Sequence, residues 1–324
     1  MKKLLSSLLV ATMLVTMLSG CSDDSDKIVI GINKFADHEA LNSAQKGFID
    51  YFKEKGYDED KIEFVIKDAT GDAVIADTIA NGYVNDEVDL IFAIATPSAQ
   101  SSYKVTKGTD IPVVFTAVTD AVDCGIVKSN EKPGGNVTGV SDIAPLEKQL
   151  LLIKEFLPNV KSIGMLYYTG EVNGKLQTDQ VKELGKKYGI EVKVQGVGST
   201  TEIASAAEQL LNSGVDCIYN ITDNTVVSAT PAIVSKANEY KKPVFAAEDG
   251  KMKNGLLASE SINYYELGKQ AGAQAYAILV DKKSPKDIPV EAAKETKLYV
   301  NKEVAKKLGI TIPSSVNERA TYLD

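Results

Sequence analysis

The 324-residue chain has one histidine, His38, one arginine, Arg319, and no tryptophan. A single histidine excludes zinc sites built from several histidines, and any catalytic triad would depend on His38 alone. Because Arg319 lies close to the C-terminus, we do not expect a guanidinium clamp for a ligand carboxylate. The sequence also has neither a Gly-x-x-x-x-Gly-Lys-Ser/Thr phosphate loop nor a Gly-x-Gly-x-x-Gly run after its first strand-like segment. No motif points to an enzyme, a metal ion or a cofactor, and we predict none of them.

Charge and cysteine content narrow the possible classes further. The formal net charge of −8 makes nucleic acid a poor partner. A composition of 44% apolar and 25% charged residues is typical of a globular protein, and the length is sufficient for two lobes with separate cores. Of the three cysteines, Cys124 and Cys217 stand far apart in the sequence. We expect both to be buried and free rather than joined in a disulfide.

The first residues have the form of an export signal. Lys2 and Lys3 precede an uncharged run from Leu4 to Met17, and Leu18-Ser19-Gly20-Cys21 follows. This ending resembles the bacterial lipobox, in which the cysteine becomes the lipidated first residue of the mature protein. An uncleaved membrane helix is the alternative, but the run is short for a span of about 20 residues. We therefore predict a signal peptide at 1–20, lipidation of Cys21 and a tether at 21–27, which holds the exported protein at the outer face of the cytoplasmic membrane.

Strand-like and helical segments alternate along both halves of the chain, which is typical of βαβ units and parallel sheets. In the first half we expect strands at 27–31, 62–67, 88–95 and 112–118, and helices at 41–55, 73–85 and 97–107. In the second half we expect strands at 162–167, 190–195, 215–221 and 243–247, and helices at 174–188, 201–213 and 224–240. The stretches "VDLIFAIATPSA" (88–99) and "VDCIYNITDNTV" (215–226) repeat one pattern of strand and polar turn. The repeat predicts an α/β fold with two doubly wound parallel-sheet lobes.

Two further segments predict how the lobes are joined. The Gly-rich stretch 131–142 follows the first lobe, and 257–263 follows the last turn of the second lobe. After these we expect a helix at 264–281, a strand-like segment at 288–299 and a short helix at 301–308. Short connections then require three crossings between the lobes, near 139, 260 and 288. The predicted lobes are 28–138 plus 260–287 and 139–259 plus 288–324, able to hinge about a cleft.

The polar turns after the repeated strands are candidate binding elements. In open parallel sheets, ligands bind beyond the carboxyl ends of the strands, where helices begin. We expect Thr96 and Asp223 to be N-caps at this edge, with free N–H groups that attract an anion. Ser98 and Thr225 would add hydroxyl groups. The alternative is that these residues only cap their helices.

Aromatic and acidic residues occupy equivalent places in the two halves. Phe35 and Tyr168 each follow the first strand of a lobe and could sandwich a flat or apolar ligand, or else fill the core. Asp120, Glu248 and Asp249 follow the last strand of each lobe. One of them could accept hydrogen bonds from a ligand ammonium, and the others could be solvated turn residues.

Several phrases in order along the mature chain match a known family. They are "FADHEALNSAQKGF" (35–48), "DLIFAIATPSAQ" (89–100), "IPVVFTAVTDAV" (111–122), "KPGGNVTGVSD" (132–142), "TDNTVVSA" (222–229), "KPVFAAEDG" (242–250), "LASESINYYELGKQAG" (257–272) and "LYVNKEVAKKLGITIP" (298–313). The chain resembles the solute-binding lipoproteins of ABC importers, specifically the TrpX-like group associated with aromatic amino acids. It departs from the expected pattern at Asp120-Ala121, where that group has Asp-Pro, and this could alter the rigidity of the turn.

The resemblance implies a type I periplasmic-binding-protein fold of the Venus-flytrap kind and no catalysis. Its cargo would be captured outside the cytoplasmic membrane and passed to an ABC permease with its ATPase. Carried onto matching positions, the ligand-binding residues of the family would be Phe35, His38, Thr96, Ser98, Thr116, Asp120, Tyr168, Asp223, Asn224 and Asp249.

We therefore predict a monomeric, lipid-anchored receptor for tryptophan, tyrosine or phenylalanine. The helix N-termini at 96–99 and 223–226 would hold the ligand carboxylate, an acidic residue its ammonium, and the aromatic rings its side chain. Three alternatives remain open: a sugar or nucleoside receptor of the same fold, a sensor that presents its ligand to a membrane signalling receptor, and an exported enzyme.

Overall fold

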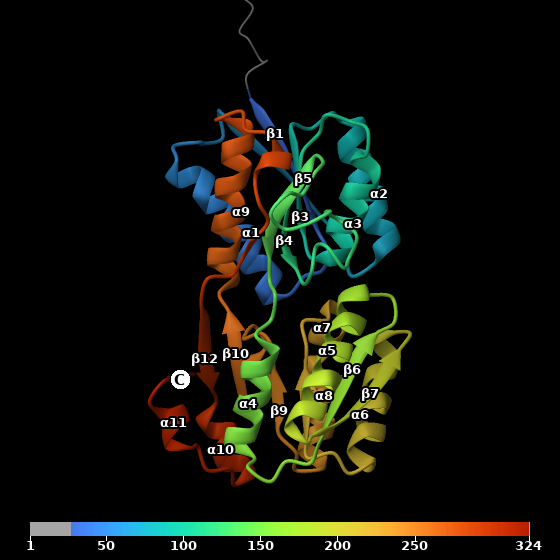
Figure 1. Cartoon of the computed structure of the whole chain (residues 1–324), viewed down its shortest axis with the longest axis vertical. Coiled ribbons are helices and arrows are strands. Elements are labelled where there is room, and N and C mark those ends of the chain that lie inside the picture. Colours follow the sequence, from blue (N-terminus) through green and yellow to red (C-terminus); the bar gives the residue numbers. More distant parts are fainter. Residues whose placement is uncertain (1–26, 324) are drawn as a thin grey trace, which may run out of the picture.

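The computed structural model describes residues 27–323. The predicted signal peptide (1–20), Cys21 and the tether residues 22–26 lie outside the described residues. The chain forms two α/β lobes, one above the other in Figure 1, and three connecting segments run between them. No helix within 27–323 is both long and apolar enough to cross a membrane.

The first lobe is a six-stranded sheet between two layers of helices. Its elements are β1 (Ile28–Lys34), α1 (Glu39–Glu54), β2 (Ile62–Asp68), α2 (Ala73–Asn85), β3 (Leu90–Ile94), α3 (Thr96–Thr106), β4 (Val113–Val118), β5 (Val137–Ser141), α9 (Tyr264–Leu279) and β11 (Glu291–Ala292). The strand order is β11-β5-β4-β3-β1-β2, and all neighbouring pairs are parallel. Every residue of β3 and β4 is buried, as their continuous apolar sequences require in a sheet covered on both faces.

Helices α1 and α9 lie side by side on one face of this sheet (Figure 1). Their backbones approach closely at Gly47 and Gly268. A Cβ at Gly47 would overlap the carbonyl oxygen of Tyr265, and one at Gly268 would overlap that of Ala44. The last long helix is therefore locked onto the first, although more than two hundred residues separate them in the sequence.

The second lobe has a seven-stranded sheet with the order β13-β12-β10-β9-β8-β6-β7. Its strands are β6 (Ser162–Tyr168), β7 (Glu191–Val197), β8 (Cys217–Asn220), β9 (Val244–Ala246), β10 (Ala258–Ile262), β12 (Thr296–Val300) and β13 (Thr321–Tyr322). Its helices are α4 (Leu146–Phe156), α5 (Val172–Tyr188), α6 (Ile203–Asn212), α7 (Asn224–Ser228), α8 (Thr230–Glu239), α10 (Lys302–Leu308) and α11 (Ser314–Asn317). The pair β10–β12 is antiparallel, whereas the other strands pair in parallel. Short 3-10 turns lie at Thr200–Glu202 and Met252–Asn254 in this lobe, and at Pro285–Asp287 in the first lobe.

The three crossings between the lobes lie further along the chain than the sequence predicts. β5 pairs with β4 in the first sheet, so the chain leaves this lobe after Ser141 rather than near 139. β10 pairs with β9 in the second sheet and moves the next crossing from 260 to 263. β11 pairs with β5 and moves the last from 288 to beyond Ala292. The predicted lobe boundaries are corrected accordingly, because each strand continues through the segment that the sequence suggested as a joint.

Two helices also differ from expectation. The predicted helix at 224–240 is divided at Ala229 into α7 and α8, because Pro231 cannot continue a helix and instead lies in the first turn of α8. α4 is a helix that the sequence pattern did not reveal. Cys124 and Cys217 are buried and free, as predicted.

Candidate ligand-binding site

The carboxyl ends of the parallel strands in the two sheets face each other across the space between the lobes. In this structure the lobes touch there through side-chain hydrogen bonds. Nε2 of His38 lies 3.2 Å from Oδ1 of Asn224, and Nε2 of Gln177 donates to Oγ1 of Thr119 at 3.2 Å. These contacts describe a closed arrangement of the lobes.

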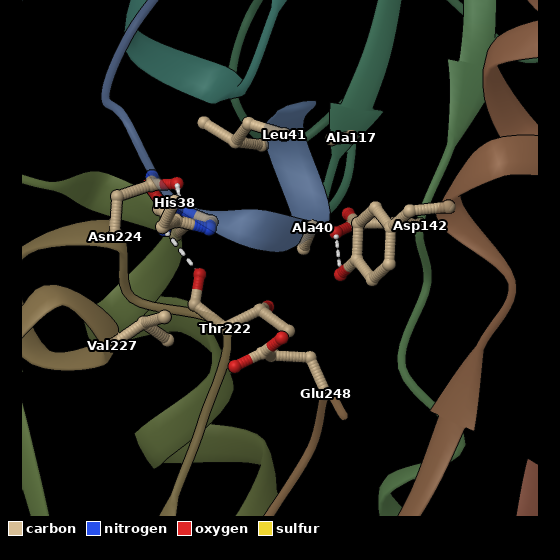
Figure 2. A pocket seen from close by; sticks show the side chains of 11 residues that line it. His38, Ala40, Leu41, Ala117, Asp142, Thr222, Asn224, Val227 and Glu248 are labelled. Atoms are coloured by element: carbon tan, nitrogen blue, oxygen red, sulfur yellow. Dashed lines mark hydrogen bonds between the residues drawn. The ribbon is translucent and has the colours of Figure 1, made fainter. Parts of the chain in front are cut away.

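A small inner cavity lies behind these contacts (Figure 2). From the first lobe it is lined by His38, Leu41, Ala117, Asp142 and Tyr264. From the second lobe it is lined by Asn173, Thr222, Asn224, Val227 and Glu248. Its volume of ≈ 10 Å³ holds about one water-sized group. Polar and aliphatic side chains therefore surround a space that fits a single small polar group.

Two buried carboxyl groups face this cavity, one from each lobe. Asp142 follows β5, and its Oδ2 accepts a hydrogen bond from the Tyr264 hydroxyl at 2.8 Å. Glu248 follows β9, and its Oε2 accepts from the backbone N–H of Gly250 at 2.7 Å. Burial raises the pKa of each carboxyl group to about 7, although the Tyr264 hydroxyl opposes the shift at Asp142, and the Gly250 N–H and the charge of Lys251 oppose it at Glu248. Such a site favours a positively charged guest.

His38 lies at the N-cap position of α1, but its side chain does not cap the helix. Burial lowers the pKa of the imidazole to about 4, although the hydrogen bond with Asn224 opposes the shift. The ring is therefore neutral at pH 7. The sequence placed His38 and Asn224 in the site by resemblance alone, and the structure places both on the wall of the inner cavity.

The N-terminus of α7 differs from expectation in one respect. Asp223 is its N-cap, as predicted, and its Oδ1 accepts from the backbone N–H of Val226 at 3.0 Å. However, the N–H groups of Asn224 and Thr225 donate to the carboxylate of Glu171, at 3.2 and 2.9 Å. A protein carboxylate thus occupies the place that we predicted for the ligand carboxylate. Burial and the neighbouring Glu171 raise the pKa of Asp223 well above its usual value.

The predicted residues of the first lobe lie mostly beneath the site. Thr96 is the first residue of α3 and not its cap, which is Ala95, and Oγ1 of Thr96 accepts from the N–H of Thr119 at 3.4 Å. Ser98 donates to Oδ1 of Asn33 at 3.2 Å inside the lobe. Thr116 is fully buried, and its hydroxyl has no hydrogen-bond partner in the described part of the chain. None of these three residues lines the inner cavity, and the hydroxyl groups of Thr96 and Ser98 instead make hydrogen bonds inside the first lobe.

The predicted pair of aromatic rings does not form a sandwich. Phe35 is 1% exposed and belongs to the hydrophobic core of the first lobe. Tyr168 is half-buried and lines an outer cleft of ≈ 700 Å³ together with Asp37, Thr70 and Asn224. Asn224 lines both spaces, so it stands between the inner cavity and the outer cleft.

The three candidate acidic residues have different surroundings. Asp120 accepts from the N–H groups of Val122 and Asp123, both at 2.9 Å, and so stabilises the turn after β4. Asp249 accepts from the Ser261 hydroxyl at 2.6 Å and lines a neighbouring cavity of ≈ 140 Å³. Of the three, only Glu248 faces the inner cavity.

Other lining residues were missed by sequence reasoning. Ala117 stands out in the structure rather than in the sequence, because its φ of 55° is uncommon for a non-glycine residue and coincides with a register shift between Thr116 and Val118. Asp142, Asn173 and Tyr264 carry no comparable signal. Within the described residues no group of three or more His, Cys, Asp or Glu side chains could hold a metal ion.

Two parallel-sheet lobes closed over a polar cavity define the class of type I periplasmic-binding proteins. A solved solute-binding protein from Bacillus halodurans has this fold, with a TM-score of 0.62 at 20% identity over 89% of this chain and 99% of that chain. The model of the family described as "ABC transporter substrate binding protein" matches residues 29–323, and the chain belongs to this family. It is a family of substrate-binding proteins rather than of enzymes, and its members are extracytoplasmic.

Three relatives are informative. The "Tyrosine-binding protein" of Clostridioides difficile (strain R20291) is 40% identical over 331 residues, which cover 98% of this chain and 95% of the relative. An ABC domain from Streptococcus pneumonia solved in complex with L-Trp is 37% identical, with a TM-score of 0.87 over 92% of this chain and 100% of that chain. A substrate-binding protein with adhesive properties from Clostridium difficile, solved ligand-free and open, is 39% identical over 92% of this chain and 99% of that chain, but its TM-score is 0.70. The better match to the ligand-bound structure agrees with the interlobe hydrogen bonds, and the resemblance inferred from the sequence is confirmed.

Proposed function

We propose that this protein binds an aromatic L-amino acid between its lobes and delivers it to an ABC permease. The observation that carries the proposal is the pair of buried carboxyl groups, Asp142 and Glu248, on one closed cavity. The names of the relatives, a tyrosine-binding protein and a domain solved with L-Trp, support an aromatic amino acid as the ligand.

The ammonium group of the ligand occupies the inner cavity. Its positive charge lowers the pKa of both carboxyl groups and lets them ionise, because it offsets the cost of burying their negative charges. A sugar or nucleoside has no such charge, and the inner cavity offers it no compensation for the buried carboxylates.

The remaining parts of the ligand are assigned by elimination. Leu41 and Val227 line the cavity from opposite lobes, and we assign the ligand ring to the place between these two side chains. Because Glu171 fills the N-terminus of α7, we assign the ligand carboxylate to the side of the cleft that the first lobe forms. Tyr168 lies at the outer cleft, on the path by which the ligand enters.

Export and anchoring complete the proposal. We propose that residues 1–20 are removed, that Cys21 carries lipid, and that the protein acts as a monomer without catalysis. Replacing Cys21 with Ser should move the protein from the membrane fraction to the soluble fraction, and retention in the membrane fraction would contradict lipid anchoring.

Calorimetry on residues 22–324 tests the ligand claim. Tyrosine, tryptophan and phenylalanine should bind, while a sugar and a nucleoside should not. Asp142→Asn and Glu248→Gln should each weaken tyrosine binding by roughly 30-fold or more, because the buried ammonium of the ligand loses a carboxylate partner. Glu183→Gln, an exposed site on α5, is the matched control and should leave binding unchanged. Equal binding by all four proteins would contradict the proposed ammonium site.

A further inference from the structure

Glu171 lies just before α5 and is 1% exposed, although it does not line the inner cavity. Its carboxylate accepts five hydrogen bonds in the second lobe. Two come from Thr225, through the backbone N–H at 2.9 Å and the hydroxyl at 2.8 Å. Two come from Asn224, through the backbone N–H at 3.2 Å and Nδ2 at 2.6 Å, and one comes from Nδ2 of Asn173 at 3.2 Å.

These bonds fix the orientation of both asparagine amides. A carboxylate only accepts hydrogen bonds, so the NH₂ group of each amide must face Glu171 and the carbonyl oxygen must point away. In Asn224 that oxygen faces Nε2 of His38 across the lobe interface, at 3.2 Å (Figure 2). In Asn173 the NH₂ group also donates to the carbonyl oxygen of Thr222 at 3.1 Å, which leaves Oδ1 free for another donor.

The amide of Asn224 in turn determines the tautomer of His38. Because Oδ1 can only accept, Nε2 of the neutral imidazole must carry the proton, and Nδ1 is left as an acceptor. Nδ1 is buried and has no hydrogen-bond partner among residues 27–323, and the same is true of Oδ1 in Asp142 and in Asn173. All three residues line the inner cavity.

Three unpartnered acceptor atoms therefore belong to residues that line the inner cavity, and this cavity fits one water-sized group. An ammonium group has three N–H donors and this size, whereas a hydroxyl group has one donor and a carbonyl oxygen has none. Two of the three acceptors, in His38 and Asn173, have the orientation that Glu171 imposes.

We propose that Glu171 is a positioning residue for amine recognition, which acts through Asn173, Asn224 and His38 to keep the inner cavity free of competing donors. The relay to His38, by which we mean the hydrogen bond between Asn224 and His38, joins the two lobes. It exists only when the lobes are closed, so closure completes the amine site. This inference rests on the proposed function, since it names the residues by which that site selects an amino acid over analogues without the amine.

The tautomer of the imidazole can be observed directly, because His38 is the only histidine in the chain. In protein labelled with [¹⁵N]histidine and saturated with tyrosine, the nitrogen spectrum should show a neutral ring with the proton on Nε2. Glu171→Gln introduces an NH₂ group among the five donors, so the amide of Asn224 should turn and the proton should move to Nδ1 or exchange between the nitrogens. A ring protonated on Nδ1 in the natural protein, or an unchanged spectrum in the variant, would overturn the inference.

Binding selectivity supplies the second readout. In Glu171→Gln, tyrosine affinity should fall by roughly 10- to 100-fold, while 3-(4-hydroxyphenyl)propionate, which lacks the amine, should lose little of its weak affinity. If Glu171 only capped α7, the variant would bind both ligands more weakly to the same extent, and the ratio of the two affinities would not change. Glu183→Gln, an exposed position on α5, the helix that Glu171 precedes, is the matched control.

A second variant, Asn224→Ala, tests the inference if Glu171→Gln does not fold. Asn224→Ala removes the relay but keeps Glu171 and its bonds to Thr225, and it should also lose selectivity for the amine. Retention of the natural ratio of affinities in Asn224→Ala would overturn the inference while leaving the proposed function intact. Failure of the natural protein to bind any amino acid would instead overturn the proposed function.

Discussion

Asp142 and Glu248 belong to different lobes, and both carboxyl groups face one closed cavity in which burial raises the pKa of each to about 7. Desolvation is the largest cause in both cases. Closure of the lobes therefore favours protonation of the two carboxyl groups, and a positively charged ligand favours their ionisation. The first two predictions follow from these opposite effects.

The ligand-free protein should lose stability as the pH rises from about 4 to 7. In this window the unfolded chain ionises both carboxyl groups, whereas the folded protein keeps them protonated, so each group lowers the unfolding free energy by up to about 4 kcal/mol above pH 7. His38 acts in the opposite sense, because its lowered pKa costs stability as the pH falls from 6.5 to about 4. Asp223, whose pKa burial and Glu171 also raise, acts in the same sense as Asp142 and Glu248, so the single imidazole does not cancel the effect of the carboxyl groups.

The measurement is the melting temperature of the natural protein and of the double variant Asp142→Asn/Glu248→Gln between pH 5 and 8. The variant should gain stability relative to the natural protein as the pH rises. A difference that does not vary with pH would show that these groups have ordinary pKa values.

Ligand binding near pH 7 should release about one proton, because an ammonium between the two half-protonated carboxyl groups lowers the pKa of both. Calorimetry in buffers of different ionisation enthalpy measures this release as a change in the observed binding enthalpy. The effect should vanish in Asp142→Asn/Glu248→Gln. Proton uptake by the natural protein would be the opposite of what this site requires.

The hydrogen bond from Gln177 to Thr119 should slow ligand release. It joins the lobes at 3.2 Å, and Thr119→Val removes its acceptor without changing the size of the side chain. A neutral hydrogen bond of this kind corresponds to a change of about 2- to 10-fold in the release rate. The chain has no tryptophan, so release of bound L-tryptophan can be followed by ligand fluorescence without background from protein tryptophan. Thr109→Val, in the first lobe, is the control, and equal rates in both variants would contradict the role of Thr119.

Close packing of α1 and α9 predicts a strong effect at Gly268. Gly268→Ala would force a methyl group against the Ala44 carbonyl oxygen, and we expect a loss of about 1–3 kcal/mol in the unfolding free energy. Gly135→Ala is the matched control, since open space surrounds that position and its φ is not positive. Denaturant unfolding measures both variants, and similar stability in the two would mean that the helices separate at little cost.

Much of the fold could be predicted from the sequence, because apolar strands and amphipathic helices alternate with clear turn residues. Helix 73–85 has the predicted bounds, and the duplicated polar turns lie at facing sheet edges, as expected. The crossings were harder to place. β5 (Val137–Ser141) is fully buried, yet its glycine and the Gly-rich residues before it made it look like a joint.

The site could be predicted only in part, because its acceptors depend on contacts between distant residues. Asp223 is recognisable as a cap from the local sequence, but nothing near it shows that Glu171, more than fifty residues earlier, fills the N-terminus of α7. Phe35 follows a strand in the same way as Tyr168, and only packing shows that one lies in the core and the other at the cleft.

A crystal structure of residues 22–324 with bound tyrosine tests the central claim most directly. We predict that the ligand nitrogen occupies the inner cavity within hydrogen-bonding distance of Asp142, Asn173 and His38, with Glu248 beside it. A ligand carboxylate in that cavity, or an amine directed to the outer cleft, would contradict the account.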